Sequence, residues 1–271
     1  MQEKVMTLEA GGKLLQDGDL VALGGNTLHR SPSAFVRELA RQGKRDLKVV
    51  KTAGAYDIDL LCAAGVVSEV YAGYVGFENL FGLAPHYRKA VEEGRVRVWE
   101  HACYTVIAGL RAAAYGIPFQ PVAGLEGSEV PRVSGFKRVT DPYSGREVFA
   151  IPPIAPDWAV IHVQEADRFG NGKILGSPFE DVLMTRAARG VILTTEKIVS
   201  PEELRQVPEL IVIPHFLVQA VIEVPGGASP CSCYPYYDLD REEIGRYLTL
   251  ADDPEKLGRY LKEKSDADRR G

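Results

Sequence analysis

The sequence has 271 residues, is 45% hydrophobic and 25% charged, and carries a formal net charge of −5 with a pI near 5.7. A chain of this length and composition can bury one sizeable core, so we expect a single domain over residues 1–271. The acidic balance argues against a nucleic-acid partner. No apolar run approaches the roughly 20 residues that span a bilayer, and no signal-peptide layout is present, so we expect a cytoplasmic protein without membrane contacts.

The first informative stretch runs from residue 17 to residue 32 and combines a turn, a short strand and the start of a helix. The apolar run at 20–23 is typical of a buried parallel strand, and Pro32 suits the first turn of a helix. Between them, Gly24 and Gly25 permit a positive φ and let a ligand approach backbone N–H groups. We predict a ligand-binding turn here, although glycines that only fit a helix onto a strand explain the pattern equally well.

Strands and helices alternate through the first half of the chain. Apolar runs and one-sided helical spacing predict strands at 20–23, 47–51, 69–74 and 95–99 and helices at 7–16, 32–42, 57–64, 85–93 and 104–115. Such alternation is typical of an α/β fold with an open, mostly parallel sheet flanked by helices. Ligands bind such sheets at the carboxyl ends of the strands. Gly54 lies in a turn of this kind, after the second strand.

The loop after the third strand carries Gly76 and, close behind it, Glu78 and Asn79. Polar residues on loops at strand ends are often functional, so we expect this acid and this amide to line a pocket. The same loop holds Phe77 and Phe81, and we expect one of these two rings to fill the core.

Between residues 122 and 153 the pattern changes to Gly, Ser and Pro punctuation. Two short alternating strands around a turn at 141–145 predict an antiparallel hairpin insertion at about 133–152. Parallel order then returns, with strands predicted at 158–163, 191–195, 210–213 and 218–224 and a helix at 179–188. The Gly170-Asn171-Gly172 turn lacks the strand-to-helix context of a phosphate loop, so we interpret it as a hairpin turn.

The last part of the chain is first irregular and then charged. Residues 225–240 are rich in Gly, Pro and Tyr, a composition suited to lying against another chain. The tail over 240–271 carries Arg, Glu and Lys at helical spacing. We expect a solvated helix that frays after Ser265.

Cysteine and histidine spacing gives no sign of a metal site. Four cysteines occur without a CxxC pair, so we expect reduced structural thiols at Cys62, Cys103, Cys231 and Cys233. No two histidines are spaced for a metal or for a Ser–His relay among His29, His86, His101, His162 and His215. We expect no metal and no permanently bound cofactor.

Taken together, three stretches resemble the alpha half, also called the A half, of the family I CoA-transferases. They are Asp17-Gly18 followed by Gly24-Gly25 and Pro32, then Tyr74-Val75-Gly76 with Glu78-Asn79, and the Gly116-Ile117-Pro118 turn. The chain departs from the family at Asn26, where Phe is usual, at Arg30, where Gly is usual, and at Phe77, an extra residue before Glu78. Asn26 and Arg30 resemble the glutaconate CoA-transferase branch. Cys103 stands where the 3-oxoacid branch has Gln and related ring-opening CoA hydrolases have Glu.

This resemblance implies a sheet like those of CoA-transferases and ribose-5-phosphate isomerase. It implies transfer of CoA between an acyl-CoA, such as acetyl-CoA, and a carboxylic acid, such as the dicarboxylate glutaconate. In the family, a Glu of the beta subunit forms a glutamyl-CoA thioester in ping-pong chemistry. The matching turn of this chain, Thr52-Ala53-Gly54-Ala55, has no acid. We therefore expect no catalytic residue here, and a CoA-transferase beta subunit as partner in an αβ, α2β2 or larger assembly.

The resemblance also implies a set of substrate-binding residues: Gly24, Gly25, Asn26, Arg30, Gly54, Gly76, Glu78, Asn79, Cys103 and Tyr104. Backbone N–H groups of Cys103 and Tyr104, at the start of a helix, would contact the thioester oxygen. Arg30 would pair with a distal carboxylate of the substrate. A surface or interface arginine, and a small buried Cys103, are equally open.

Two alternatives remain. One is a subunit of a ring-opening CoA-ester hydrolase, which Cys103 disfavours because a thiol cannot replace a carboxylate base. The other is a non-catalytic ligand-binding domain of the same fold, similar to sugar-phosphate sensors. Such a domain would adjoin a DNA-binding segment, and the sequence contains no segment of that kind.

Overall fold

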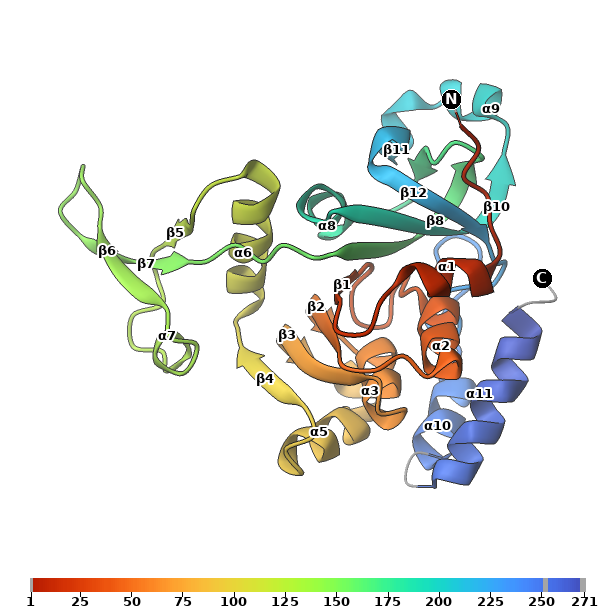
Figure 1. The fold of residues 1–271 in the computed structure, drawn as a ribbon, viewed down its shortest axis with the longest axis horizontal. Coiled ribbons are helices and arrows are strands. Elements are labelled where there is room, and N and C mark those ends of the chain that lie inside the picture. Colours follow the sequence, from red (N-terminus) through yellow and green to blue (C-terminus); the bar gives the residue numbers. More distant parts are fainter. Residues whose placement is uncertain (1, 251–252, 269–271) are drawn as a thin grey trace.

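The computed structural model describes residues 2–250 and 253–268. Its main feature is a sheet whose parallel strands run in the order β12-β10-β8-β1-β2-β3-β4, with the short β9 and β11 added antiparallel beside the far half of β8 (Figure 1). The nine strands are β1 (Leu20–Leu23), β2 (Leu47–Gly54), β3 (Val67–Val75), β4 (Arg97–Glu100), β8 (Trp158–Asp167), β9 (Gly172–Lys173), β10 (Gly190–Val199), β11 (Ile211–Ile213) and β12 (Val218–Glu223). The predicted α/β fold with a mostly parallel sheet is confirmed.

Helices cover both faces of this sheet. The helices are α1 (Leu8–Leu14), α2 (Ser33–Gln42), α3 (Tyr56–Ala63), α4 (Glu78–Phe81), α5 (Pro85–Glu92), α6 (Cys103–Tyr115), α7 (Val130–Val133), α8 (Asp181–Ala187), α9 (Pro201–Arg205), α10 (Arg241–Leu250) and α11 (Pro254–Asp268), with single 3₁₀ turns η1 (Pro208–Leu210) and η2 (His215–Leu217). No helix in the described part of the chain is long and apolar enough to cross a membrane.

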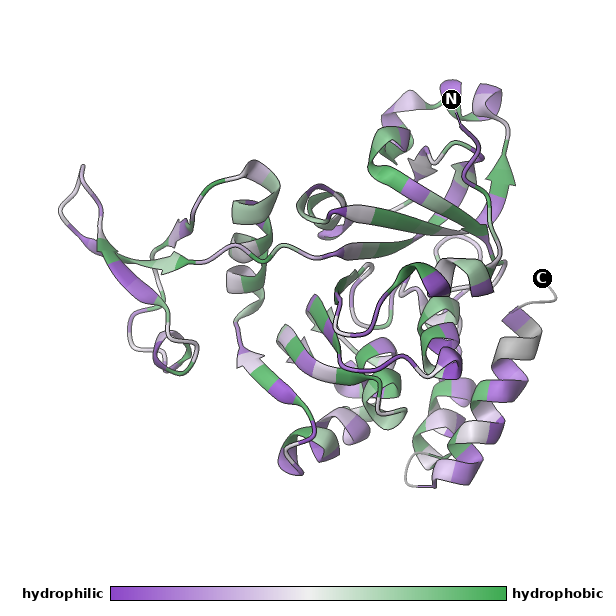
Figure 2. Cartoon of the chain, viewed as in Figure 1, coloured by the Kyte–Doolittle hydropathy of each residue, from purple (hydrophilic) through white to green (hydrophobic). Residues whose placement is uncertain are grey.

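The alternation of side chains along β1 explains why both faces are covered. Leu23 packs into one core with Phe35 of α2, whereas the neighbouring Ala22 packs into a second core with Leu110 of α6 and Met184 of α8. A strand buried on both faces has to be continuously apolar. Figure 2 shows mostly hydrophobic residues along β12, whereas polar residues interrupt the second half of β8. Phe77 is fully buried in the first core, as predicted for one of the two rings in its loop.

A second, three-stranded antiparallel sheet projects beyond α6 (Figure 1). It contains β5 (Gln120–Val122), β6 (Lys137–Thr140) and β7 (Glu147–Ile151), in the order β5-β7-β6. The predicted hairpin is the β6–β7 pair. The third strand, β5, was not predicted, because a three-residue strand containing Pro121 has almost no sequence pattern.

The prediction of a solvated C-terminal tail is wrong. Tyr247 of α10 and Tyr260 of α11 are buried, and the Tyr247 hydroxyl donates a 2.7 Å hydrogen bond to Asp59 in α3. Arg37 of α2 forms a bidentate pair with Asp268, at 2.7 Å for each bond. The apolar stripe that docks these helices is narrow and is hidden among many charges in the sequence. The helix α11 continues to Asp268, and residues 269–271 of the predicted frayed end lie outside the described residues.

Candidate functional site

The carboxyl ends of β1, β2 and β3 meet at one edge of the sheet, and their loops are joined by backbone hydrogen bonds. The Thr27 N–H donates to the Ala53 oxygen at 2.9 Å, and the Gly76 N–H donates to the Gly54 oxygen at 3.0 Å. The structure thus brings together the glycines of all three turns. They are predicted site residues that lie in separate parts of the sequence.

The paired glycines serve packing. The Gly24 N–H donates to the Val160 oxygen at 2.9 Å, and the Gly25 N–H donates to an Asp181 oxygen at 2.8 Å. Gly25 has φ +70°, and a Cβ there would lie 2.3 Å from the His29 oxygen, so no other residue fits. Both N–H groups already have acceptors inside the chain, so a ligand at this turn would contact other atoms, and the prediction that the turn binds a ligand stays a prediction.

A buried ion pair between Lys51 and Asp57 contacts the glycine turn after β1. Lys51 of β2 lies 2.6 Å from an Asp57 oxygen and also donates to the Gly24 oxygen at 2.8 Å, and both charged side chains are fully buried. Burial works to raise the pKa of Asp57, but Lys51, the Ala55 N–H and the Ser31 hydroxyl outweigh it and hold that pKa below its usual value. Asp57 is therefore an internal counter-ion.

Arg30 is also internal. It is 3% exposed, and its guanidinium is paired with the fully buried Asp181 carboxylate. The remaining contacts go to the His162 oxygen at 2.8 Å and the Ser177 oxygen at 3.0 Å. Because Asp181 already compensates its charge and three of its five N–H donors are bonded inside the chain, Arg30 is not a surface arginine, and its charge is not free for a second substrate carboxylate. Sequence alone could not reveal Asp181, which lies 151 residues away.

The loop after β3 presents Glu78 at the outer side of the same edge. The Thr27 hydroxyl donates to the Glu78 carboxylate, and the Glu78 N–H donates to the Tyr74 hydroxyl at 3.2 Å. Glu78 has φ +56°, a left-handed conformation that is unusual for a residue other than glycine and that aims its side chain back toward Thr27. Asn79 is exposed beside it, and Asn26 is half-buried in the turn after β1.

A second polar group, formed by Thr52, Glu180 and Cys103, lies at the end of β2. Of these three residues, only Cys103 was predicted from the sequence as a site residue. The Thr52 hydroxyl donates a 2.7 Å hydrogen bond to the Glu180 carboxylate, and the Cys103 thiol donates to the Thr52 oxygen at 3.4 Å. Burial and the nearby Glu180 carboxylate raise the pKa of the Cys103 thiol. Cys103 is exposed at the first residue of α6, so the alternative of a small buried side chain is wrong. Tyr104, the next residue, is 49% exposed.

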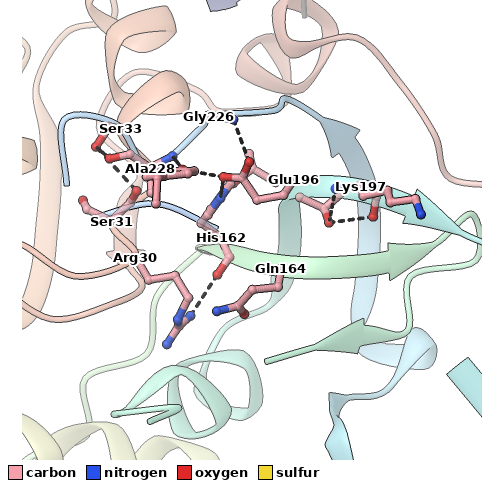
Figure 3. A network of polar contacts seen from close by, with 12 residues as sticks. Arg30, Ser31, Ser33, His162, Gln164, Glu196, Lys197, Gly226 and Ala228 are labelled. Atoms are coloured by element: carbon pink, nitrogen blue, oxygen red, sulfur yellow. Dashed lines mark hydrogen bonds and ion pairs between the residues drawn. The ribbon is translucent and has the colours of Figure 1, made fainter. Parts of the chain in front are cut away.

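A third cluster lies deeper, between β8, β10 and the irregular segment after β12 (Figure 3). The His162 Nε2 atom lies 2.7 Å from a Glu196 oxygen, and the Tyr237 hydroxyl donates to the same carboxylate. The other Glu196 oxygen accepts the Gly226 N–H at 2.6 Å. Burial works to raise the pKa of Glu196, but these donors outweigh it and lower that pKa.

In the described part of the chain, this cluster is the group best placed to hold a metal ion. The ligand atoms of His162, Glu196 and Cys233 lie within 4.8 Å of one another, and all three residues are buried. The spacing of these residues along the chain gave no sign of this. Because His162 and Glu196 already bond to each other, and burial raises the pKa of Cys233 to about 12, we describe the cluster as a polar network inside the fold.

Comparison with known proteins gives a consistent set of matches. The model of the family described as coenzyme A transferase matches residues 5–224. An uncharacterised protein of Archaeoglobus fulgidus is 40% identical over 92% of this chain, which spans 56% of that longer protein. The alpha (A) subunit of glutaconate CoA-transferase from Acidaminococcus fermentans is 34% identical over 96% of this chain and 87% of its own length.

Two further comparisons extend this set. The cholesterol ring-cleaving hydrolase IpdA subunit of Mycobacterium tuberculosis is 33% identical over 93% of this chain and 89% of its own length. The crystal structure of glutaconate coenzyme A-transferase from Acidaminococcus fermentans superposes with a TM-score of 0.91 at 33% identity, covering 98% of this chain and 90% of that one.

Proposed function

This chain belongs to the coenzyme A transferase family, and from that membership we propose that it is the alpha subunit of a heteromeric enzyme that moves CoA between an acyl-CoA and a small carboxylic acid. One observation carries the proposal: likeness to the alpha subunit of a glutaconate CoA-transferase extends over 96% of this chain, and the two folds superpose with a TM-score of 0.91. CoA and its thioester are substrates in this proposal, with no permanently bound cofactor.

The nucleophile of the exchange belongs to a partner, the beta subunit. The acids that this chain holds closest to its glycine turn are Asp57 and Asp181, and each is buried against a cation. A carboxylate that attacks a thioester needs an accessible oxygen, which neither of them has. Glu78 and Glu180 are half-buried at the same edge, but we assign neither of them the nucleophile, because the resemblance places that Glu in the beta subunit. The chain therefore supplies the wall of a shared site. Exchange proceeds through a glutamyl-CoA thioester on the partner, with ping-pong kinetics.

The rim of the site suits a partner subunit. Large apolar side chains are exposed next to its polar residues, at Leu80 beside Asn79, Tyr104 beside Cys103 and Phe179 beside Glu180. Exposed large apolar side chains are common in protein interfaces. The assembly is an αβ unit or a multiple of it. Four free thiols suit the reducing cytoplasm, where we place the enzyme.

Acetyl-CoA and glutaconate are the substrates to test first, since a glutaconate CoA-transferase subunit is among the similar proteins. Because Asp181 neutralises Arg30, the second carboxylate of such an acid has to be bound by a cation of the partner. Asn26, Glu78, Asn79, Cys103 and Tyr104 are half-buried or exposed at the site edge and remain our candidates for substrate contacts from this chain.

A hydrolase subunit is the second candidate. Two observations favour it: the 33% identity to a ring-cleaving hydrolase subunit, and the Glu180 carboxylate, which lies close enough to Cys103 to raise the pKa of its thiol. A carboxylate beside the acyl group can act as a base for water.

The test is co-expression of this chain with a CoA-transferase beta subunit from the same genome. CoA transfer from acetyl-CoA to glutaconate is measured for the purified complex and for each chain alone. We expect transfer by the complex and none by either chain. Transfer by this chain alone would contradict the assignment of the nucleophile to the beta subunit. Release of CoA without transfer to any acid would favour the hydrolase.

A further inference from the structure

Glu180 is a half-buried acid at the candidate site that has no cationic partner among the described residues. It directly precedes α8, and its carboxylate reaches the end of β2, where the Thr52 hydroxyl donates a 2.7 Å hydrogen bond to Oε2. The next residue, Asp181, turns the other way and pairs with Arg30. The same turn therefore buries one acid as a counter-ion and presents the other at the edge of the sheet.

The other acids at this edge are held differently. Asp57 and Asp181 are fully buried ion-pair partners, so solvent does not reach their oxygens. Glu78 accepts the Thr27 hydroxyl on the β3 side. Glu180 and Cys103 both contact Thr52, Glu180 through the Thr52 hydroxyl and Cys103 through the Thr52 oxygen at 3.4 Å, which places Glu180 beside the exposed start of α6.

The Thr52 side chain fixes one oxygen of Glu180 and leaves the other free. A carboxylate has about four lone-pair positions on its two oxygens, and within the described residues one is used, by Thr52. Thr52 is 2% exposed and belongs to a central strand, so it is a rigid support. A positioned carboxylate with a free oxygen can accept a proton from a bound water molecule.

We propose that Glu180 is a general base that this chain brings to the shared site, and that it activates water for hydrolysis of a bound acyl-CoA thioester. Glu180 takes a proton from water as the water oxygen attacks the thioester carbonyl carbon. The carbon–sulfur bond then breaks, and the CoA thiolate leaves and takes up the proton held by Glu180. The products are the free carboxylic acid and CoA, and no further reactant is consumed.

This inference rests on the proposed function in one respect, since the acyl-CoA has to bind at the site shared with the beta subunit. The test therefore uses the purified complex and two assays on the same sample. CoA release from acetyl-CoA without an acceptor acid reports hydrolysis, and CoA transfer to glutaconate reports exchange. Removal of a general base lowers a rate by about 10²- to 10⁴-fold.

We expect Glu180→Gln to lower the ratio of hydrolysis to transfer at least about tenfold. Thr52→Val, which removes the supporting hydroxyl, should lower the same ratio less. Glu209→Gln, which changes an exposed acid before β11, is the matched control and should leave both rates unchanged.

Three other results of the two assays would contradict the inference, and one of them would also contradict the proposed function. A complex that transfers CoA but does not hydrolyse acetyl-CoA overturns the inference and leaves the proposed function standing. A hydrolysis-to-transfer ratio that is unchanged in Glu180→Gln also overturns it. Absence of both activities in the unmodified complex contradicts the proposed function and the inference together.

Discussion

Arg30 and Asp181 form a buried ion pair between residues 151 positions apart in the sequence, and the second oxygen of Asp181 accepts the Gly25 N–H at 2.8 Å. One carboxylate thus holds both the glycine turn after β1 and the arginine that follows it. The pair explains why the charged side chain of Arg30 can be buried. Arg30 has φ +53° and lies in a turn that carries predicted site residues.

Asp181→Asn should be strongly destabilising. It removes the counter-ion of a buried guanidinium, and breaking one side of such a pair costs about 3–5 kcal/mol. Urea unfolding of the variant measures the loss. Glu129→Gln, which breaks an exposed pair with Arg132, is the control and should change stability by less than about 1 kcal/mol. Equal stability of the two variants would mean that the Arg30–Asp181 pair does not hold the turn.

Lys51→Met should destabilise the protein through the Asp57 carboxylate, which would remain buried without its cation. We expect a loss of about 3–5 kcal/mol in the free energy of unfolding, partly restored by Asp57→Asn in the same chain. Lys13→Met, at an exposed pair with Glu9, provides the matched control. If the double variant is no more stable than Lys51→Met alone, the two charges are not coupled as described.

Acidification should destabilise the fold through His101. Burial lowers the pKa of His101 to about 4, whereas an unfolded histidine titrates near 6.5. Between these values the unfolded chain binds more protons, so stability falls as the pH drops from about 6.5 to about 4, by on the order of 3 kcal/mol from this residue. Urea unfolding of the protein and of His101→Gln over this range measures the effect. A variant with the same pH dependence as the parent would contradict the assignment.

Tyr247→Phe should loosen the C-terminal helices. The hydroxyl of Tyr247 donates to a fully buried Asp59 oxygen that also bonds to the His86 ring, and the loss of one such hydrogen bond costs about 0.5–1.5 kcal/mol. Thermal unfolding of the variant should show a lowered midpoint. Tyr143→Phe, at a side chain that is 98% exposed, should show none. If both variants unfold like the parent, the contact does not dock α10.

The fold was largely predictable because its strands are short apolar runs at regular intervals. The strand at 20–23 matches β1, and the hairpin turn at 141–145 connects β6 and β7 as predicted. The C-terminal helices were misjudged because Tyr247 and Tyr260 stand among many charged residues. Their docking depends on distant partners, Asp59 and Arg37, which have no local pattern.

The sequence indicated candidate site residues loop by loop, but it did not indicate which side chains of different loops contact one another. Glu78 and Asn79 follow β3 and were predicted from that placement alone. Glu180 and Thr52 are 128 residues apart and meet because β8 pairs with β1, which joins the second half of the sheet to the first. The contacts of Gly25 and Arg30 with Asp181 could not be predicted for the same reason, because this acid comes from a different part of the sequence.

The central claim is that this chain forms one wall of a shared site while the covalent chemistry takes place on the partner. It is tested most directly by intact-mass measurement of both subunits after the complex has reacted with acetyl-CoA and the thioester has been trapped. We predict a CoA adduct on the beta subunit and an unmodified mass for this chain. A CoA adduct on this chain would contradict the account and would make Glu78 and Glu180 the first residues to replace.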